Sequence, residues 1–310
     1  MSLESSLAVA RRWRAISCLL ASLLVTMPAT AHAQTMAATL FVEVRDQTGA
    51  WLPDVTLTLT DQQTALMREG TTSSSGLLVI PLLTAGTYTL QAGREGFKTE
   101  IVRDIAVQAG VRGTVNVVMV PGSITEQVVV SADLTTLRAG SGTVGEVFDG
   151  ETLVTVPVSE RDVIQFTFHA PGIAPPSPGS RLSTQGNVGL NNSGSREAAN
   201  DFRLDGVDNN DLFLNRLVVN PSLDAVREVS VHQSTYDAEH GRSAGAQVNV
   251  VIKSGTRTLR GSAYEYFRDE ALDARPAFVP DGTGKPALGK HQFGGTVGGP
   301  FGRMPAFYFV

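Results

Sequence analysis

The sequence contains little of what defines several common protein classes. Its 310 residues include one cysteine, Cys18, and aromatic residues make up 6% of the chain. Lys and Arg number 25 against 30 Asp and Glu, which gives a formal net charge of -5. The chain therefore lacks the basic excess that attracts nucleic acid, and we expect no nucleic-acid partner.

The first 33 residues have the parts of a secretory signal peptide. Basic residues, a short apolar run and a small-residue cleavage site follow one another as Arg11, Arg12, Arg14, then 15–25, then 31–33. The apolar run is shorter than the roughly 20 residues of a membrane-spanning helix, which argues against the alternative of an N-terminal anchor. Removal of residues 1–33 would also remove Cys18. A mature protein without thiols excludes a disulfide framework, a thiolate zinc site and a cysteine nucleophile.

From residue 38 onward the sequence shows short strands separated by turns. Between Val55 and Thr60 every second residue is apolar and the intervening residues are threonines, which is typical of a strand with one buried face. Similar runs, ended by Gly, Pro, Asp or Ser, lie at 40–44, 78–80, 87–92 and 115–119. The spacing predicts about seven strands between residues 38 and 120, and hence a β-sandwich.

Five short motifs in the same region resemble the carboxypeptidase regulatory-like domain. They are Thr48-Gly49-Ala50, Pro53-Asp54-Val55, Ser75-Gly76, Ala85-Gly86-Thr87-Tyr88 and Gly96-Phe97. The resemblance implies a transthyretin-like or Ig-like β-sandwich over residues 34–121, a fold often linked with carbohydrate-binding modules. An unrelated exported sandwich would show the same alternation and is the alternative.

A β-branched stretch follows the sandwich within the segment 122–132. Its residues Glu126, Gln127, Val128, Val129 and Val130 have no obvious hairpin partner in the sequence. An exposed strand of this kind offers unpaired backbone groups for strand addition by another protein. The stretch is similar to the Ton box of TonB-dependent receptors, which implies pairing with TonB, the periplasmic energy-coupling protein. The alternatives are an eighth sandwich strand or a linker packed on the next domain.

Residues 133–255 have a mixed α/β pattern with long polar loops. The segment 159–162, Ser-Glu-Arg-Asp, fits a capping box and predicts a short helix that continues to Phe168. A second short helix is predicted at 222–226, and strands are predicted at 228–231 and 246–252. The Gly/Ser/Asn-rich tract 177–200 is longer than an ordinary connection between elements.

Two glycine patterns in this region suggest chemistry but stand in the wrong context. The dinucleotide pattern at 140–145 has neither a strand directly before it nor a convincing helix after it. The nucleophile-elbow pattern at 241–245 places Ser243 before a strand, whereas a hydrolase needs a helix there. A hydrolase that uses Ser243 is therefore a weak third option.

Metal chemistry has equally little support in the sequence. Asp205, Asp208 and Asp211 resemble a calcium loop in composition, but Val207 occupies the third ligand position. The histidines stand apart from one another and from metal-binding spacings; they are His169, His232, His240 and His291. We therefore predict no catalytic residue, no metal site and no cofactor.

The segments 200–209, 222–229 and 236–256 resemble, in order and spacing, the plug of TonB-dependent receptors, in particular the Oar-like branch. The first resembles the plug's aspartate-glycine strand and turn, and the other two resemble its last helix and strand. The residues that carry this motif are Asp205, Gly206, Asp208, Gly241, Lys253, Ser254 and Gly255. The resemblance implies an α/β plug domain over residues 133–255.

The segment after the plug resembles the first hairpin of the family's barrel, with motifs at 261–268, 272–275 and 292–300. A plugged transporter barrel has ~22 strands of about 9 to 11 residues each. Because 55 residues follow Gly255, we expect only the first strands of an outer-membrane β-barrel, as in a truncated receptor. Phe293 and Val297 share the face that we expect toward lipid, and Gln292 lies on the opposite face.

Together these patterns predict a mainly β protein with five parts. They are a signal peptide 1–33, a sandwich 34–121, a Ton box and linker 122–132, a plug 133–255 and the start of a barrel 256–310. The resemblance implies energy-coupled uptake of an unidentified extracellular solute, a carbohydrate being one candidate, across the outer membrane. The expected partners are TonB, outer-membrane lipid and the solute, with the sandwich and coupling stretch on the periplasmic side. The alternative is a secreted or surface carbohydrate-binding or adhesive β-sandwich protein, and neither function is enzymatic.

Overall fold

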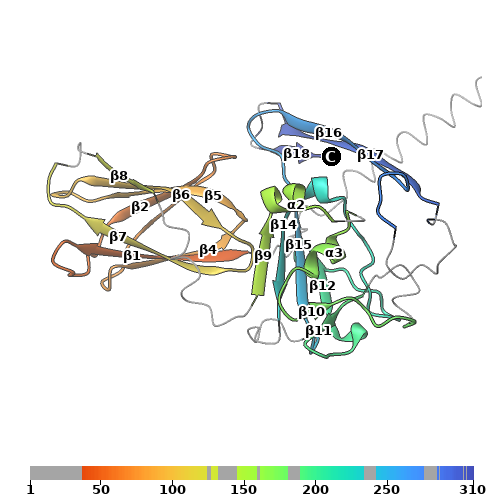
Figure 1. Cartoon of the computed structure of the whole chain (residues 1–310). Coiled ribbons are helices and arrows are strands. Elements are labelled where there is room, and N and C mark those ends of the chain that lie inside the picture. Colours follow the sequence, from red (N-terminus) through yellow and green to blue (C-terminus); the bar gives the residue numbers. More distant parts are fainter. Residues whose placement is uncertain are drawn as a thin grey trace, which may run out of the picture. The chain divides into compact units, whose positions relative to one another are not determined.

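The computed structural model describes residues 37–123, 127–131, 145–158, 161–180, 189–233, 242–275, 285, 287–302, 304 and 306–310. These residues form a β-sandwich, an α/β unit at the residues for which we predicted a plug, which we call the plug after that prediction, and a three-stranded sheet (Figure 1). The predicted mainly β fold is therefore confirmed. The segment 1–33, for which we predicted a signal peptide, lies outside the described residues. In the part of the chain that is described, no helix has the length and apolar character needed to cross a membrane.

Seven strands build the sandwich, as the spacing predicted. They are β1 (Ala38–Asp46), β2 (Thr56–Asp61), β3 (Met67–Thr71), β4 (Leu77–Leu83), β5 (Gly86–Gly93), β6 (Thr99–Val107) and β7 (Arg112–Met119). An eighth strand, β8 (Gln127–Ser131), extends one of the two sheets, whose order is β3-β2-β5-β6-β8; the other sheet has the order β4-β1-β7. Neighbouring strands are antiparallel except for the pairs β1–β7 and β6–β8, which are parallel.

The sandwich core follows from the apolar alternation along the strands. Side chains of β1 that are at most 1% exposed are Ala38, Leu40, Val42 and Val44. Leu57 and Leu59 of β2 enter the same core from the other sheet, whereas Thr56 is exposed and Thr58 and Thr60 are half-buried. Because burying one such aliphatic side chain contributes about 1.5–3 kcal/mol, this alternation fixes which face of each strand points inward.

The plug is built on a five-stranded sheet of order β13-β12-β15-β14-β9. Its strands are β9 (Gly145–Asp149), β12 (Asp201–Leu204), β13 (Val207–Asp208), β14 (Val226–His232) and β15 (Gln247–Ile252). Beside the sheet lie α2 (Gly150–Thr155), α3 (Val163–Thr167), the one-turn helices η2 (Glu197–Ala199) and η3 (Leu223–Ala225), and the short pair β10 (Ile173–Ala174) and β11 (Asn191–Asn192). A second core joins helices to sheet and includes Phe148, Leu153, Phe166, Phe202, Val229 and Val250.

The two predicted plug helices are shorter than expected. Asp162 caps α3, because its Oδ1 accepts a hydrogen bond from the Ile164 N–H at 2.8 Å. Ser159, with which the predicted capping box begins, lies outside the described residues. The helix predicted at 222–226 is the single turn η3, because Val226 already pairs with Ile252 as the first residue of β14. The strands predicted at 228–231 and 246–252 correspond to β14 and β15.

The last described strands form an open antiparallel sheet of order β16-β17-β18. They are β16 (Arg260–Asp269), β17 (Gly289–Pro300) and β18 (Phe307–Phe309), and β16 pairs with β17 along its whole length. Phe293 and Val297 are 78% and 42% exposed on one face, while Gln292 and Thr296 are half-buried on the other. The two faces thus differ in the way that the sequence predicted.

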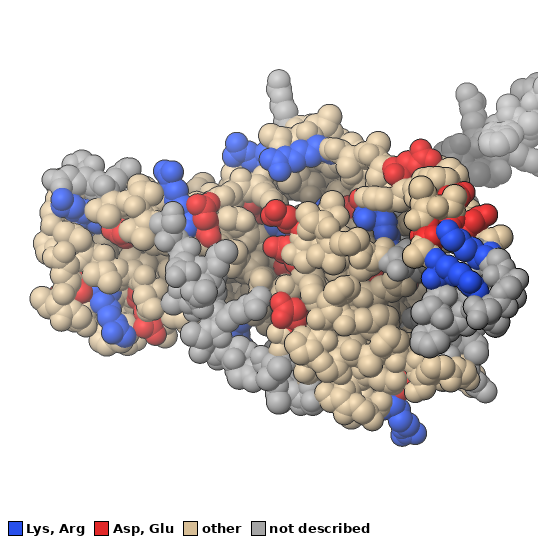
Figure 2. All heavy atoms as spheres, in the orientation of Figure 1, with Lys and Arg blue, Asp and Glu red and all other residues tan. Residues whose placement is uncertain are grey.

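Charged side chains are mixed on the surface of the described residues. Figure 2 shows Lys and Arg interspersed with Asp and Glu on the face that it draws. This distribution agrees with a sequence that has no basic excess.

Candidate functional site

The stretch that we predicted to couple to TonB forms an edge strand of the sandwich. Gln127, Val128, Val129 and Val130 lie in β8, and Glu126 lies outside the described residues. β8 pairs in parallel with β6, in a register that runs from Thr99 opposite Gln127 to Arg103 opposite Ser131. The sequence offered no hairpin partner for this stretch, and the described residues give β8 none. Its partner is instead the parallel strand β6, so the structure realises the alternative of an eighth sandwich strand. The sequence could not show this pairing, because a parallel partner is distant along the chain.

β8 nevertheless keeps the property that strand addition requires. It stands last in its sheet, and no strand among the described residues pairs with its other edge. The side chains of Val129 and Val130 are 51% and 46% exposed. The backbone groups along the outer edge of β8 are thus available to a further strand.

The aspartate-glycine motif of the plug forms the tight turn between β12 and β13. Asp205 and Gly206 both have positive φ, 49° and 82°, the conformation in which glycine and aspartate are tolerated best. The Asp205 N–H donates to the Val250 carbonyl at 2.8 Å, and Asp205 Oδ1 accepts from the Ile252 N–H at 2.9 Å. The turn therefore fastens β12 to the end of β15, where the chain leaves the plug.

The two aspartates of this motif differ in their electrostatic surroundings. Burial raises the pKa of the Asp205 carboxyl, an effect that the hydrogen bond from Ile252 reduces. Burial also opposes ionisation of Asp208, but hydrogen bonds from Asn210 and Arg242 outweigh it and lower its pKa. Asp208 is thus held as a carboxylate, whereas ionisation of Asp205 costs free energy.

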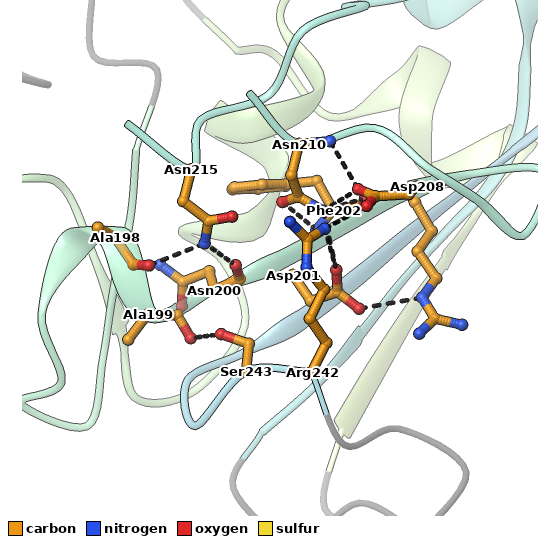
Figure 3. A network of polar contacts seen from close by, with 11 residues as sticks. Ala198, Ala199, Asn200, Asp201, Phe202, Asp208, Asn210, Asn215, Arg242 and Ser243 are labelled. Atoms are coloured by element: carbon orange, nitrogen blue, oxygen red, sulfur yellow. Dashed lines mark hydrogen bonds and ion pairs between the residues drawn. The ribbon is translucent and has the colours of Figure 1, made fainter. Parts of the chain in front are cut away.

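Asn210 connects both strands of this hairpin (Figure 3). Its Nδ2 lies 2.8 Å from Asp201 Oδ1, 2.6 Å from Asp208 Oδ1 and 2.9 Å from the Phe202 carbonyl oxygen. Its Oδ1 accepts from the Phe202 N–H at 2.9 Å. The amide group has two hydrogens for three acceptors, so the acceptors share them. One side chain thereby satisfies the polar groups at the start of β12.

Two arginines balance the carboxylates around Asn210. Arg242 Nη1 lies 2.5 Å from Asp208 Oδ2 and 3.7 Å from Asp201 Oδ1. Arg203 Nε lies 3.0 Å from Asp201 Oδ2, and the Asp201 side chain is only 1% exposed. A buried carboxylate destabilises a fold unless charge and hydrogen bonds compensate it, and here both do. The network joins β12 to the segment that precedes β15.

Ser243 takes part in the neighbouring contacts between the same two segments. Its Oγ donates to the Ala199 carbonyl, and the Gly245 N–H donates to the same oxygen at 2.6 Å. Asn200 Oδ1 accepts from the Ala246 N–H at 2.9 Å. The strand β15 follows, as expected, so the surroundings of Ser243 are those of a turn that leads into a strand and differ from those of a nucleophile elbow.

The other two chemical patterns are not assembled in the described residues. Asp205 binds the Ile252 N–H, Asp208 binds Arg242, and Asp211 accepts from the Phe213 and Leu214 N–H groups of its own loop. No three potential metal ligands lie together in the described ranges. The dinucleotide pattern lies outside them except for Gly145, its last glycine, which begins strand β9.

The last plug-motif residues lie where the plug meets the open sheet. Lys253 Nζ donates to the Asp224 carbonyl at 2.7 Å, which ties the end of β15 to η3. Gly255 passes so close to β17 and β18 that an added Cβ would overlap the backbone of Tyr308. Ser254 lies between them along the chain, and Gly241 lies outside the described residues. A side chain at position 255 would therefore force the plug and the sheet apart.

Asp201, Arg203, Asn210 and Asn215 belong to the site, although the sequence motifs did not assign them a role. Asn215 Nδ2 donates to the carbonyl oxygens of Ala198 and Asn200, at 2.8 and 2.6 Å. The sequence held one signal for these residues: the segment 200–215 is richer in Asn and Asp than its turns alone would require. A hydrophobicity pattern does not identify such residues, because they are polar and their burial is compensated by hydrogen bonds.

Two domain families match the ends of the described structure. Residues 39–120 match the Carboxypeptidase regulatory-like domain, and residues 251–310 match an Outer membrane beta barrel domain. With these two matches, the chain is similar to a class of protein, the outer-membrane TonB-dependent receptors that carry a carboxypeptidase regulatory-like domain. The resemblance to this class that the motifs indicated is confirmed.

One relative is the TonB-dependent transporter Oar of Myxococcus xanthus, to which the chain is 26% identical over 299 residues. The match covers 94% of this chain and 27% of Oar, so the chain spans about a quarter of that relative's length. Solved structures with some similarity include the siderophore receptor PirA from Pseudomonas aeruginosa (16% identity, 52% of this chain, 26% of that chain, TM-score 0.36). Another is the outer membrane transporter YddB from Escherichia coli (12% identity, 50% of this chain, 24% of that chain, TM-score 0.38).

Proposed function

We propose that this chain forms the coupling and plug part of an outer-membrane transporter that takes up an extracellular solute with energy delivered by TonB. The observation that carries the proposal is the order of elements along the chain. The strand β8, which has no second neighbour among the described residues, precedes the plug sheet, and β15 of that sheet is followed by residues 253–259 and then by β16. The match of residues 251–310 to an outer-membrane barrel domain favours this function over a secreted carbohydrate-binding sandwich.

The proposed cycle assigns a role to the plug, the coupling stretch, the segment 1–33 and the last three strands. The solute binds on the outer side of the plug, and TonB pairs with the coupling stretch 126–130 on the periplasmic side. Tension on that stretch moves the plug and opens a path for the solute. No bond of the solute forms or breaks, so the chain has no enzymatic activity. The segment 1–33 directs export, and the strands β16, β17 and β18 contact outer-membrane lipid on the face that carries Phe293.

The test removes the backbone donors of β8 on both of its edges. Successive residues of a strand direct their N–H groups to opposite edges, so Val128→Pro combined with Val129→Pro removes one donor from each. We expect cells with this double variant to lose solute uptake and crosslinking to TonB.

The matched control is Val128→Thr combined with Val129→Thr, which keeps the N–H groups and the β-branched shape. This control should retain uptake. Normal uptake and normal crosslinking in the proline variant would refute the assignment of the coupling stretch.

A further inference from the structure

We propose that Arg161 is a strained clamp between the plug and the open sheet. Its side chain fastens the segment before α3 to β16, and it does so in a conformation that costs free energy. The same residue therefore has two positions of similar free energy, one on β16 and one in solvent. The clamp does not depend on the proposed function; only its consequence does, which is that the plug rests against β16 until tension is applied.

The guanidinium of Arg161 lies between a carboxylate of the plug and an aromatic ring of β16. Its Cζ atom lies 3.6 Å from the centroid of the Tyr266 ring, which is a cation–π contact. Its Nη2 lies 3.4 Å from Asp224 Oδ2 in η3. The side chains of Arg161 and Asp224 are each 11% exposed, so water screens their charges little. Arg161 thus links the segment before α3, the turn η3 and the strand β16.

A second contact between the plug and β16 lies beside the first. The hydroxyl oxygens of Ser222 and Tyr264 are 2.9 Å apart, and Ser222 Oγ donates to Asp224 Oδ2 at 3.4 Å. Tyr264 and Tyr266 lie on the same face of β16, with their ring centroids 5.5 Å apart. Gly294 of β17 leaves room for Tyr264, because a Cβ there would lie 2.5 Å from the phenol oxygen. Two tyrosines of β16 therefore form the surface on which this part of the plug lies.

Arg161 makes its contacts at a cost. Its φ is 50°, in the left-handed region that residues with a β-carbon seldom adopt. Its Nε atom is buried and has no hydrogen-bond partner among the described residues. A buried donor without a partner is unfavourable, and the distance of 3.4 Å to Asp224 is long for a compensating hydrogen bond. Strain and the unsatisfied donor both disappear when the side chain leaves the site, so the second position is favoured as well.

Arg203 of the plug site shows the contrast with a fixed arginine. It lies inside the strand β12, and its Nε lies 3.0 Å from Asp201 Oδ2. Its backbone does not have a positive φ. Arg203 therefore compensates a buried charge without strain, whereas Arg161 holds its partners against strain.

The test measures hydrogen exchange at the amides of residues 164–168 in the whole chain, purified in detergent. The Ile164 N–H is bonded to the side chain of Asp162, the neighbour of Arg161, so exchange there reports release of this segment. Tyr266→Leu removes the aromatic ring and keeps an apolar side chain. Because the cation–π contact is then lost, we expect exchange about fivefold faster.

The matched control is Phe267→Leu in the same strand. Phe267 is the next residue of β16, so its side chain lies on the opposite face, where its ring contacts His291. The control removes one aromatic ring from β16 without touching Arg161. We expect it to leave exchange at residues 164–168 unchanged.

The strain is tested by adding Arg161→Gly, because glycine adopts a positive φ without penalty. In the unmodified chain, Arg161→Gly removes the clamp and should make exchange at residues 164–168 faster. In the Tyr266→Leu chain the contact with the ring is already lost, and relief of the strain remains. There the same substitution should make exchange slower, by about threefold. This reversal of sign is the signature of a strained clamp.

Three results would overturn the proposal. They are unchanged exchange in Tyr266→Leu, equal effects of Tyr266→Leu and Phe267→Leu, and faster exchange when Arg161→Gly is added to Tyr266→Leu. If the amides of β16 lose their protection in Tyr266→Leu, Arg161→Lys replaces it, because lysine keeps the charge and lacks the planar guanidinium. Exchange should again be faster at residues 164–168, and unchanged exchange would overturn the proposal. Neither solute nor TonB takes part, so the proposed function fails only on its own test, the β8 variants.

Discussion

At the scale of single residues, the plug site combines an unusual backbone conformation with buried charge. Asp205 has a φ of 49° and a carboxyl whose pKa is raised by burial, yet its Oδ1 accepts from the Ile252 N–H. The side chain is thus required for its hydrogen bond and its tolerance of positive φ, while its negative charge is unfavourable. Asparagine meets the first two requirements without the charge.

Asp205→Asn should therefore stabilise the plug at pH 7, and Asp205→Ala should destabilise it by about 1 kcal/mol through loss of the hydrogen bond. The ordinary pKa of 3.8 applies to the unfolded chain, and the folded value is higher. Ionisation consequently costs stability above the folded-state pKa, and this cost falls as the pH drops through it. The rate of hydrogen exchange at the Ile252 amide reports the stability of the plug in both variants. An advantage of Asn that does not shrink toward pH 4 would contradict this account.

Ser243 provides a second prediction at this scale. Because its Oγ donates to the Ala199 carbonyl in a turn before β15, Ser243→Ala should cost about 1 kcal/mol of stability and change no chemistry. The measurement is hydrolysis of a chromogenic ester by the chain in detergent, with and without the substitution. Turnover that disappears in Ser243→Ala would support the third option, a hydrolase that uses Ser243.

At the scale of elements, β8 is the strand for which the structure adds most to the interpretation from the sequence. The sequence shows its β-branched composition, which predicts a strand, but not the parallel register with β6. A strand at a sheet edge satisfies the backbone groups of its neighbour and leaves its own outer groups open. β8 therefore contributes to the stability of the sandwich as well as to the proposed coupling.

A fragment of residues 34–121 should fold cooperatively, because its core residues, such as Leu40 and Leu57, lie within it. Extending the fragment to residue 131 adds β8 and should raise its melting temperature, since the edge of β6 is then paired. We expect a gain of about 1–2 kcal/mol from several net hydrogen bonds, reduced by the entropy of ordering the added strand. Equal melting temperatures for the two fragments would show that β8 is not held on β6.

At the scale of the whole molecule, the success of the sequence analysis depends on which physical signal defines each part. β1, β2 and β5 were predictable because one buried face imposes apolar alternation on their residues. β3 was not, because its five residues are all exposed or half-buried and carry no such pattern. Asp201 and Asn210 were not predictable as site residues, because only the folded chain brings their partners together.

The central claim is that β8 is the point at which TonB engages this chain, and site-specific photo-crosslinking in cells tests it most directly. A photo-reactive amino acid replaces Val129 in β8 or, as a control, Glu69 in β3, the strand at the opposite edge of the same sheet. Both side chains are exposed. The account predicts a covalent product with TonB from position 129 and none from position 69. Equal products from positions 129 and 69, or no product from position 129, would contradict it.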